Sequence, residues 1–153
     1  LNEEEFYAGK GFIKNIGEFD ANEENPFTGF VFSPDLFGSR NLNYLKRIAD
    51  LCRNEQIDLV GIEAPLPPSS FSRIENYEIV RSFYKQISET LSLQIFDYNI
   101  INETEGILSD KDFKDFNHLN FSGAEKLTAH VCKTILQRYL DERAWNNYYS
   151  SDE

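Results

Sequence analysis

The sequence predicts an α/β domain in which a parallel sheet is flanked by helices. Two observations predict it: helical and strand patterns alternate from residue 41 onward, and parallel strands are usually joined by crossover helices. The 153 residues, 41% of them hydrophobic, are enough for one domain with its own core. We divide the chain into a poorly defined segment at 1–40, the α/β part at 41–143 and a tail at 144–153.

The first helix and strand follow from the spacing of apolar residues. A helix is expected from Asn41, its predicted N-cap, to about Asn54, because apolar residues recur there three and four positions apart. The run 57–63 is short and apolar, which is typical of a buried strand. Proline cannot donate to a sheet ladder, so Pro65 and the prolines after it end this strand.

A second helix and strand repeat the pattern. The apolar stripe at 74–91 predicts a helix, and the run 94–98 predicts a strand. Residues 99–117 are expected to form a long polar connection, and loops of this length are often functional. The segment 28–32 is a further candidate for a short strand.

The last helix has the clearest start signal. The segment from Ser122 to Glu125 has the pattern of a capping box with Ser122 as N-cap, and the apolar repeat continues to about Glu142. The only cysteines, Cys52 and Cys132, fall on apolar helix faces, so we interpret them as small buried hydrophobic residues.

Two strands are too few for a stable parallel sheet. Either residues 1–40 add strands, or a segment upstream of Leu1 does. The sequence contains no methionine, so we interpret Leu1 as the start of a processed product or of a cut piece. The expectation is therefore an incomplete, C-terminal portion of an α/β domain.

The charge disfavours several classes of partner. With a net charge of −11 and a pI of about 4.6, the chain would be repelled by a nucleic acid duplex or an anionic membrane. No apolar run approaches the ~20 residues that a membrane span needs. No Gly-rich phosphate loop follows either strand, which argues against a nucleotide-binding domain.

The stretch 112–124 carries the strongest chemical signal, because Asp115 stands three residues before His118 just ahead of the last helix. A carboxylate can accept the Nδ1–H of a histidine, fix its tautomer and stabilise the imidazolium, which leaves Nε2 as a general base. The alternative is that both side chains only satisfy free N–H groups and the dipole at the helix start.

The motif Asp115-x-x-His118-Leu119-Asn120, followed by Gly123-Ala124 and an amphipathic helix, resembles the C-terminal block of SGNH (GDSL-type) hydrolases. It is most similar to the branch that includes acyl-transfer proteins of cell-envelope polysaccharide modification, and the similarity covers about residues 41–142. The resemblance implies a flavodoxin-like three-layer sandwich. It also implies an esterase or O-acyltransferase in which Asp115 orients His118 and His118 activates a serine.

In that family the serine lies in a Gly-Asp-Ser-like turn after an N-terminal strand. The nearest sequences here are Gly38-Ser39 and Phe32-Ser33, and neither follows a convincing strand pattern, so the serine is expected outside this chain. The resemblance implies substrates that are acyl esters of small molecules or of cell-envelope carbohydrates. It further implies no metal or organic cofactor and an extracytoplasmic or envelope-associated location.

Weaker candidates lie nearby or at strand ends. Glu63 and Asp97 follow the two strands at the edge that faces the ligand crevice in open parallel sheets, so Glu63 is a candidate substrate-binding residue; simple solvation is the alternative. Asn120 can brace the loop backbone and is a second substrate-binding candidate. The acidic residues of the loop lack calcium-loop spacing, so we interpret them as solvated and predict no metal site: Asp110, Asp112 and Asp115.

A second hypothesis, from a different class, is a non-catalytic α/β module that serves binding or assembly within a larger envelope protein. The serine missing from this chain favours it, and the sequence upstream of Leu1 would separate the two hypotheses. The sequence does not give the oligomeric state.

Overall fold

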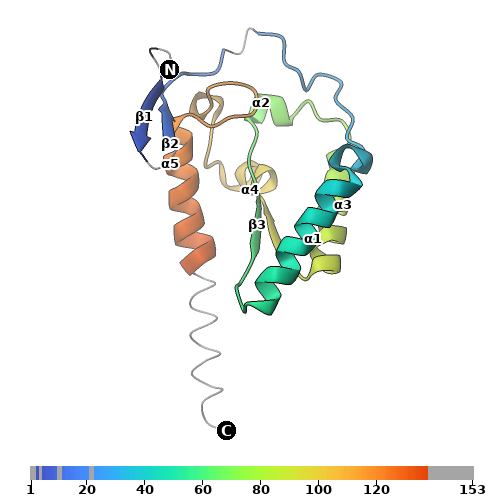
Figure 1. Cartoon of the computed structure of the whole chain (residues 1–153). Helices are drawn as coiled ribbons and strands as arrows, with labels where there is room; N and C mark the ends of the chain where they lie inside the picture. The colour runs from blue at the N-terminus through green and yellow to red at the C-terminus, as the bar shows by residue number, and fades with distance from the viewer. Residues whose placement is uncertain (1–2, 4, 10–11, 21–22, 138–153) are drawn as a thin grey trace. The chain divides into compact units, whose positions relative to one another are not determined.

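A small parallel sheet flanked by helices gives the chain its mixed α/β character, as the sequence predicts (Figure 1). The computed structural model describes residues 3, 5–9, 12–20 and 23–137. The chain divides into two units. Unit 1 consists of Leu1–Asp20 and Ile107–Glu153, and unit 2 of Ala21–Gly106.

The parallel sheet belongs to unit 2. Its strands, β3 (Val60–Glu63) and β4 (Gln94–Asp97), lie within the two predicted runs and pair in parallel. The register runs without a shift, so Glu63 and Asp97 are direct neighbours where both strands end. The parallel pairing inferred from the alternating pattern is therefore confirmed.

Two long helices of unit 2, α1 (Ser39–Asn54) and α3 (Tyr77–Leu91), correspond to the predicted helices. The residue before α1, Gly38, is its N-cap, and the predicted cap Asn41 instead donates to the Phe37 carbonyl at 2.7 Å. Residues of both helices and of the turn before β4 form the buried core: Ala49, Phe83, Ile87, Leu91 and Leu93. Burying an aliphatic or aromatic side chain of this size contributes about 1.5–3 kcal/mol.

The predicted strand at 28–32 is wrong. A turn occupies 26–29, and a short 3₁₀ helix, η1 (Pro34–Phe37), follows. Both backbone groups of Phe32 are hydrogen-bonded to the Asn76 side chain. The Phe32 N–H donates to Asn76 Oδ1 at 2.7 Å, and the Phe32 carbonyl accepts from Asn76 Nδ2 at 2.8 Å. These are the groups that a sheet ladder would need.

The long polar connection predicted at 99–117 is also wrong, because it contains two helices. Helix α4 (Tyr98–Glu105) starts directly after β4, where the Asp97 carboxylate caps it by accepting from the N–H groups of Asn99 and Ile100. The second is a short 3₁₀ helix, η2 (Asp110–Asp112). A further short helix, α2 (Pro68–Phe71), follows the prolines after β3. Such short polar helices have a weak apolar pattern, because they depend on capping and tertiary contacts, and periodicity therefore does not predict them.

Unit 1 has its own antiparallel pair, β1 (Glu5–Gly9) and β2 (Phe12–Asn15), which forms a sheet separate from β3 and β4. In the described part of the chain, residues 1–40 therefore add strands but do not extend the parallel sheet. Helix α5 (Phe121–His130) continues into a π-helical segment, η3 (Val131–Leu136). The predicted helix end at Glu142 lies outside the described residues.

The start of α5 differs from the predicted capping box. The N-cap is Asn120, whose Oδ1 accepts from the Gly123 N–H at 3.0 Å. Ser122 lies inside the helix, and its Oγ donates to Asp112 Oδ1 at 3.2 Å. Asparagine is as good a cap as serine, and Asn120 occupies the position from which its side chain reaches the third helical residue.

The two cysteines are not both buried, so that prediction is wrong. Cys52 is half-buried and Cys132 is exposed, and neither forms a disulfide. In η3 the inward position belongs to Ile135, which is 7% exposed.

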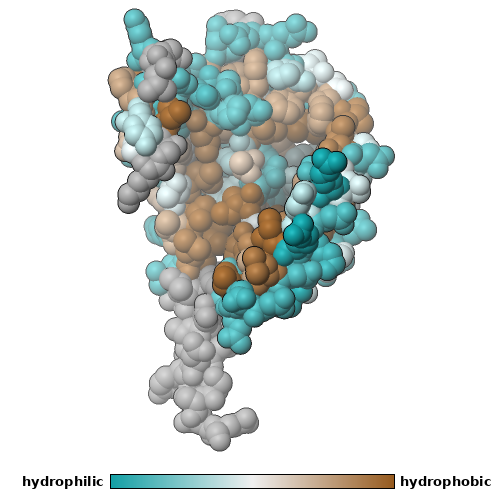
Figure 2. Space-filling view, in the orientation of Figure 1, coloured by the Kyte–Doolittle hydropathy of each residue, from teal (hydrophilic) through white to brown (hydrophobic). Residues whose placement is uncertain are grey.

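Apolar side chains also remain open to solvent on α1, where Tyr44, Ile48 and Leu51 are exposed; Figure 2 shows apolar surface beside polar surface near the C-terminal end of this helix. None of the helices in the described part of the chain is long and apolar enough to cross a bilayer.

Candidate functional site

The loop between η2 and α5 is closed by its own backbone. Phe113 and Leu119 form an isolated antiparallel bridge. Within it, the Lys114 N–H donates to the His118 carbonyl at 2.9 Å, and just outside it the Asn120 N–H donates to the Asp112 carbonyl at 3.0 Å. The Phe113 side chain is completely buried and anchors this closure. Residues 115–118 form the tip of the loop.

At the tip, Asp115 contacts His118 as the spacing predicts. His118 Nδ1 lies 2.9 Å from Asp115 Oδ1 and 3.0 Å from Oδ2. The same Oδ1 accepts the backbone N–H groups of Asn117 at 3.1 Å and of His118 at 2.8 Å. One carboxylate therefore shapes the turn and orients the imidazole at the same time.

The electrostatics favour an ionised Asp115. Burial alone would raise the pKa of this carboxyl, but the N–H groups of Asn117 and His118 and the His118 ring outweigh it and hold the pKa below its usual value. An ionised carboxylate requires a proton on Nδ1, which leaves the Nε2 lone pair available when the ring is neutral. The His118 side chain is 63% exposed, and no residue in the described ranges hydrogen-bonds Nε2.

Asn120 holds the base of the loop. Only 4% of it is exposed, and its Nδ2 donates to the carbonyls of Lys111 at 2.7 Å, Gly17 at 3.1 Å and Phe113 at 3.4 Å. Asn120 rather than Asp115 or His118 caps α5, but the Asp115 carboxylate does satisfy two backbone N–H groups of the loop, those of Asn117 and His118. Every polar atom of the Asn120 amide is engaged inside unit 1, so the structure gives it a positioning role, and its role in substrate binding stays a prediction.

Asp112 is not solvated, contrary to the sequence-based interpretation. Its side chain is 3% exposed and forms an ion pair with Lys126 of α5, with Nζ 2.7 and 2.8 Å from its two oxygens. Its Oδ2 also accepts from the Ser109 N–H at 2.9 Å and Oγ at 3.2 Å. This network ties η2 to α5 beneath the loop. Ser109-x-x-Asp112 has the spacing of a capping box, a signal that could have identified it.

Glu63 lies in unit 2, whereas the Asp115–His118 pair belongs to unit 1. At the ends of β3 and β4, Glu63 is hydrogen-bonded to the Tyr84 hydroxyl, while the Tyr77 hydroxyl donates to both Asp97 oxygens at 2.8 and 2.9 Å. Burial, followed by the nearby Asp97 charge, raises the pKa of Glu63 although the Tyr84 hydrogen bond opposes it. Burial and the paired carboxylates also raise the pKa values of both tyrosines.

Both tyrosines come from α3, two helical turns apart, and sequence reasoning missed them. Their positions in an apolar stripe, i and i+7, gave no sign that their hydroxyl groups meet the acidic strand ends. Glu63 and Asp97 do lie at the ends of the two parallel strands, as the sequence predicts, and the register makes them neighbours. A role for Glu63 in substrate binding stays a prediction.

The two serines nearest to the family's nucleophile pattern, Ser33 and Ser39, both belong to unit 2. Ser33 precedes η1 and Ser39 is the first residue of α1, and neither follows a strand. Across the residues that the structure describes, no group of three or more His, Cys, Asp or Glu side chains has the arrangement of a metal site.

A protein-family model matches residues 31–140, and the chain belongs to this family, which is uncharacterised. The matched segment includes the Asp115–His118 loop, the Asp112 network and the Glu63 group. No curated protein and no solved structure matches the chain.

Proposed function

We propose that this member of an uncharacterised family is the C-terminal portion of an SGNH-like esterase or O-acyltransferase, with His118 as general base and Asp115 as the residue that orients it. The observation that carries the proposal is the contact of both Asp115 oxygens with Nδ1 of an exposed imidazole. The proposal includes a flavodoxin-like three-layer sandwich, in which strands from outside this chain extend the sheet of β3 and β4.

In the proposed reaction a serine supplied from outside residues 1–153 attacks the carbonyl carbon of an acyl ester. His118 Nε2 takes the serine proton as the C–O bond forms, and then donates it to the departing alcohol as the tetrahedral intermediate collapses. The resulting acyl-serine is attacked by water or by a sugar hydroxyl, which His118 deprotonates in the same way. The acylated carbohydrates of the cell envelope are the proposed substrate class, on the strength of the motif resemblance.

The double role of Asp115 makes one substitution especially informative. In Asp115→Asn the amide oxygen can still accept the N–H groups of Asn117 and His118, so the turn keeps its acceptor. The amide NH₂ takes the place of Oδ2 at 3.0 Å from Nδ1, while the amide oxygen stays 2.9 Å from Nδ1. The tautomer that carries the proton on Nε2 therefore gains a partner, and the loss of the carboxylate charge weakens the base. In a serine protease triad, the corresponding change lowers kcat about 10⁴-fold without disturbing the geometry.

The tautomer can be measured on this chain directly. We expect ¹⁵N NMR of neutral His118 to show a protonated Nδ1 and an unprotonated Nε2, and Asp115→Asn to increase the share of the Nε2-protonated tautomer. His130 is the matched control, since it is the only other histidine. A His118 that is mostly protonated on Nε2 in the unsubstituted chain would contradict the proposed base.

Activity is tested in the longer protein that carries the serine. His118→Ala is expected to lower ester hydrolysis by several orders of magnitude, whereas His130→Ala leaves it nearly unchanged. Fluorophosphonate labelling of the present chain is expected to modify no serine; a labelled serine that loses reactivity on denaturation would place the nucleophile inside the chain. Full activity in His118→Ala would overturn the proposal and favour the non-catalytic binding or assembly module.

A further inference from the structure

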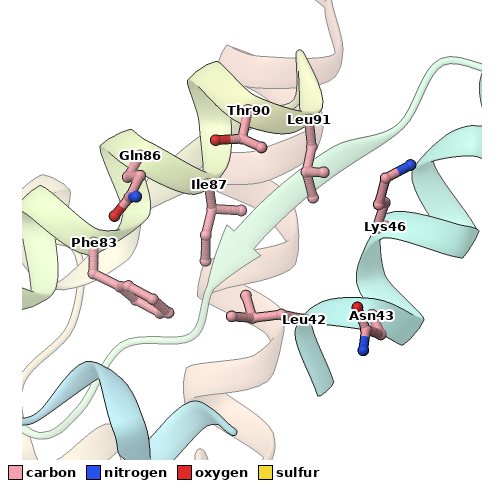
Figure 3. A pocket seen from close by; sticks show the side chains of 8 residues that line it. All are labelled: Leu42, Asn43, Lys46, Phe83, Gln86, Ile87, Thr90 and Leu91. Carbon is pink, nitrogen blue, oxygen red and sulfur yellow. The ribbon is translucent and has the colours of Figure 1, made fainter. Parts of the chain in front are cut away.

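A groove between α1 and α3 opens into the core of unit 2. It holds about 240 Å³, and its apolar wall consists of Leu42 from α1 and Phe83, Ile87 and Leu91 from α3. The three α3 residues are 6–8% exposed and belong to the buried core cluster. In Figure 3, Leu42 points toward Phe83 and Ile87 from the opposite helix. The groove is thus a small open cleft whose floor consists of core side chains.

The rim of the groove is polar and carries no acidic residue. It consists of Asn43 and Lys46 on α1 and Gln86 and Thr90 on α3, all of which can donate hydrogen bonds. The rim therefore favours a ligand whose polar end accepts hydrogen bonds.

The charges around the groove favour an anion. Lys46 lies 2.5 Å from Asp50, and Arg53 lies 2.9 Å from the other oxygen of the same carboxylate. Arg53 also donates to the Leu91 carbonyl at 3.0 Å, which joins the C-terminal ends of α1 and α3. Two cations thus share one anion beside the groove, leaving a local excess of positive charge in a chain whose net charge is −11. An ammonium has three donors, so Lys46 can hold Asp50 and a ligand together.

We propose that this groove binds a single-chain aliphatic carboxylate, such as a medium-chain fatty acid, with its tail against Leu42, Phe83 and Ile87 and its head at Lys46 and Asn43. A small polar anion could contact Lys46 and Asn43 at the rim but would leave the apolar wall of the groove uncovered, so the wall favours a ligand with an aliphatic tail. The inference does not rest on the proposed hydrolase chemistry, because the groove lies within unit 2 and binding needs no turnover.

The test is a ¹H–¹⁵N NMR titration of the whole chain with octanoate, kept well below its micelle concentration. Octanol and octylammonium, with the same tail and different heads, are the matched probes. We expect saturable shifts of the groove amides with octanoate, weaker binding of octanol, and the weakest binding of octylammonium. No saturable shift at millimolar octanoate, or equal binding of octylammonium, would overturn the proposal.

Two variants locate the site. Lys46→Gln should weaken octanoate binding about twofold to fivefold and leave octanol binding unchanged, as expected for one ion pair with an exposed lysine. Lys85→Gln is the control, because Lys85 forms the same i,i+4 type of pair with Glu89 on α3 but does not line the groove. Equal loss of affinity in both lysine variants would point to unspecific charge attraction and overturn the proposal.

Asn43→Trp should fill the rim and reduce octanoate affinity more than tenfold. Asn43 is exposed on α1, so the substitution leaves the core intact, and circular dichroism checks the fold. Unchanged affinity in Asn43→Trp would place the ligand elsewhere and refute the assignment of the groove.

Discussion

Removing the charge of Asp112 should destabilise unit 1 strongly, although this residue touches neither Asp115 nor His118. Asp112→Asn keeps the shape of the side chain but replaces one acceptor oxygen by an NH₂ group. That group must face either Lys126 Nζ or the Ser109 N–H, both of which are donors within 2.9 Å of the native carboxylate. Breaking a buried ion pair typically costs 3–5 kcal/mol, and Lys126, half-exposed, recovers part of its hydration. We therefore expect a loss of about 2–4 kcal/mol.

The assay is urea unfolding at a series of pH values, with Glu125→Gln as control, because Glu125 is an exposed carboxylate on the same helix. The Lys126 ion pair and the Ser109 hydrogen bonds overcome the effect of burial and lower the pKa of Asp112 below 3.8. A lowered folded-state pKa stabilises the fold above the unfolded-state pKa, and this contribution is lost as pH falls through the folded value. The difference between the unsubstituted protein and Asp112→Asn should hence be constant from pH 7 to about 5 and shrink below pH 4. A loss no larger than that of Glu125→Gln, or one that does not change in acid, would refute this reasoning.

Two further predictions concern packing and pH. Gly123→Ala should lower the free energy of unfolding by about 1–3 kcal/mol. The added Cβ would overlap the Asp112 carbonyl oxygen and lie 2.8 Å from a Leu119 methyl. This clash outweighs the gain of about 1 kcal/mol in helix propensity. Thr128→Ala, at an exposed position of α5, gives the propensity gain alone, so a Gly123→Ala protein as stable as Thr128→Ala would contradict the overlap. Glu63→Gln should remove a pH dependence of the free energy of unfolding. The folded-state pKa of Glu63 is raised above 4.5, so the protonated carboxyl stabilises the fold below that value. This stabilisation is lost as pH rises through the folded-state pKa. Denaturant unfolding of both proteins between pH 4 and 8 measures this, and an identical pH profile would show that Glu63 does not titrate abnormally.

The elements predicted well from the sequence are those whose signal lies within one segment. Helices α1 and α3 have apolar residues at helical spacing, which α3 buries more fully than α1, and β3 and β4 are short apolar runs, so periodicity alone locates them. Helix α4 has no such stripe and depends on the Asp97 cap, and the failed strand at 28–32 is decided by Asn76, 44 residues away from Phe32. The sequence around Phe32 holds no trace of that partner.

The same distinction explains which part of the candidate site was visible in the sequence. The Asp115–His118 contact spans three residues, and the loop that holds it closes within 112–120, so its geometry is encoded locally and the motif identifies it. Its support is less local, because Lys126 comes from a later turn of α5 and Gly17 from the other end of the chain. A serine nucleophile contributed by a distant segment would likewise leave no signal in the sequence around the loop. A pair that folds with its loop can keep its orientation whether or not such a segment is present. The ¹⁵N measurement of the His118 tautomer therefore tests the base in this chain before any serine is identified.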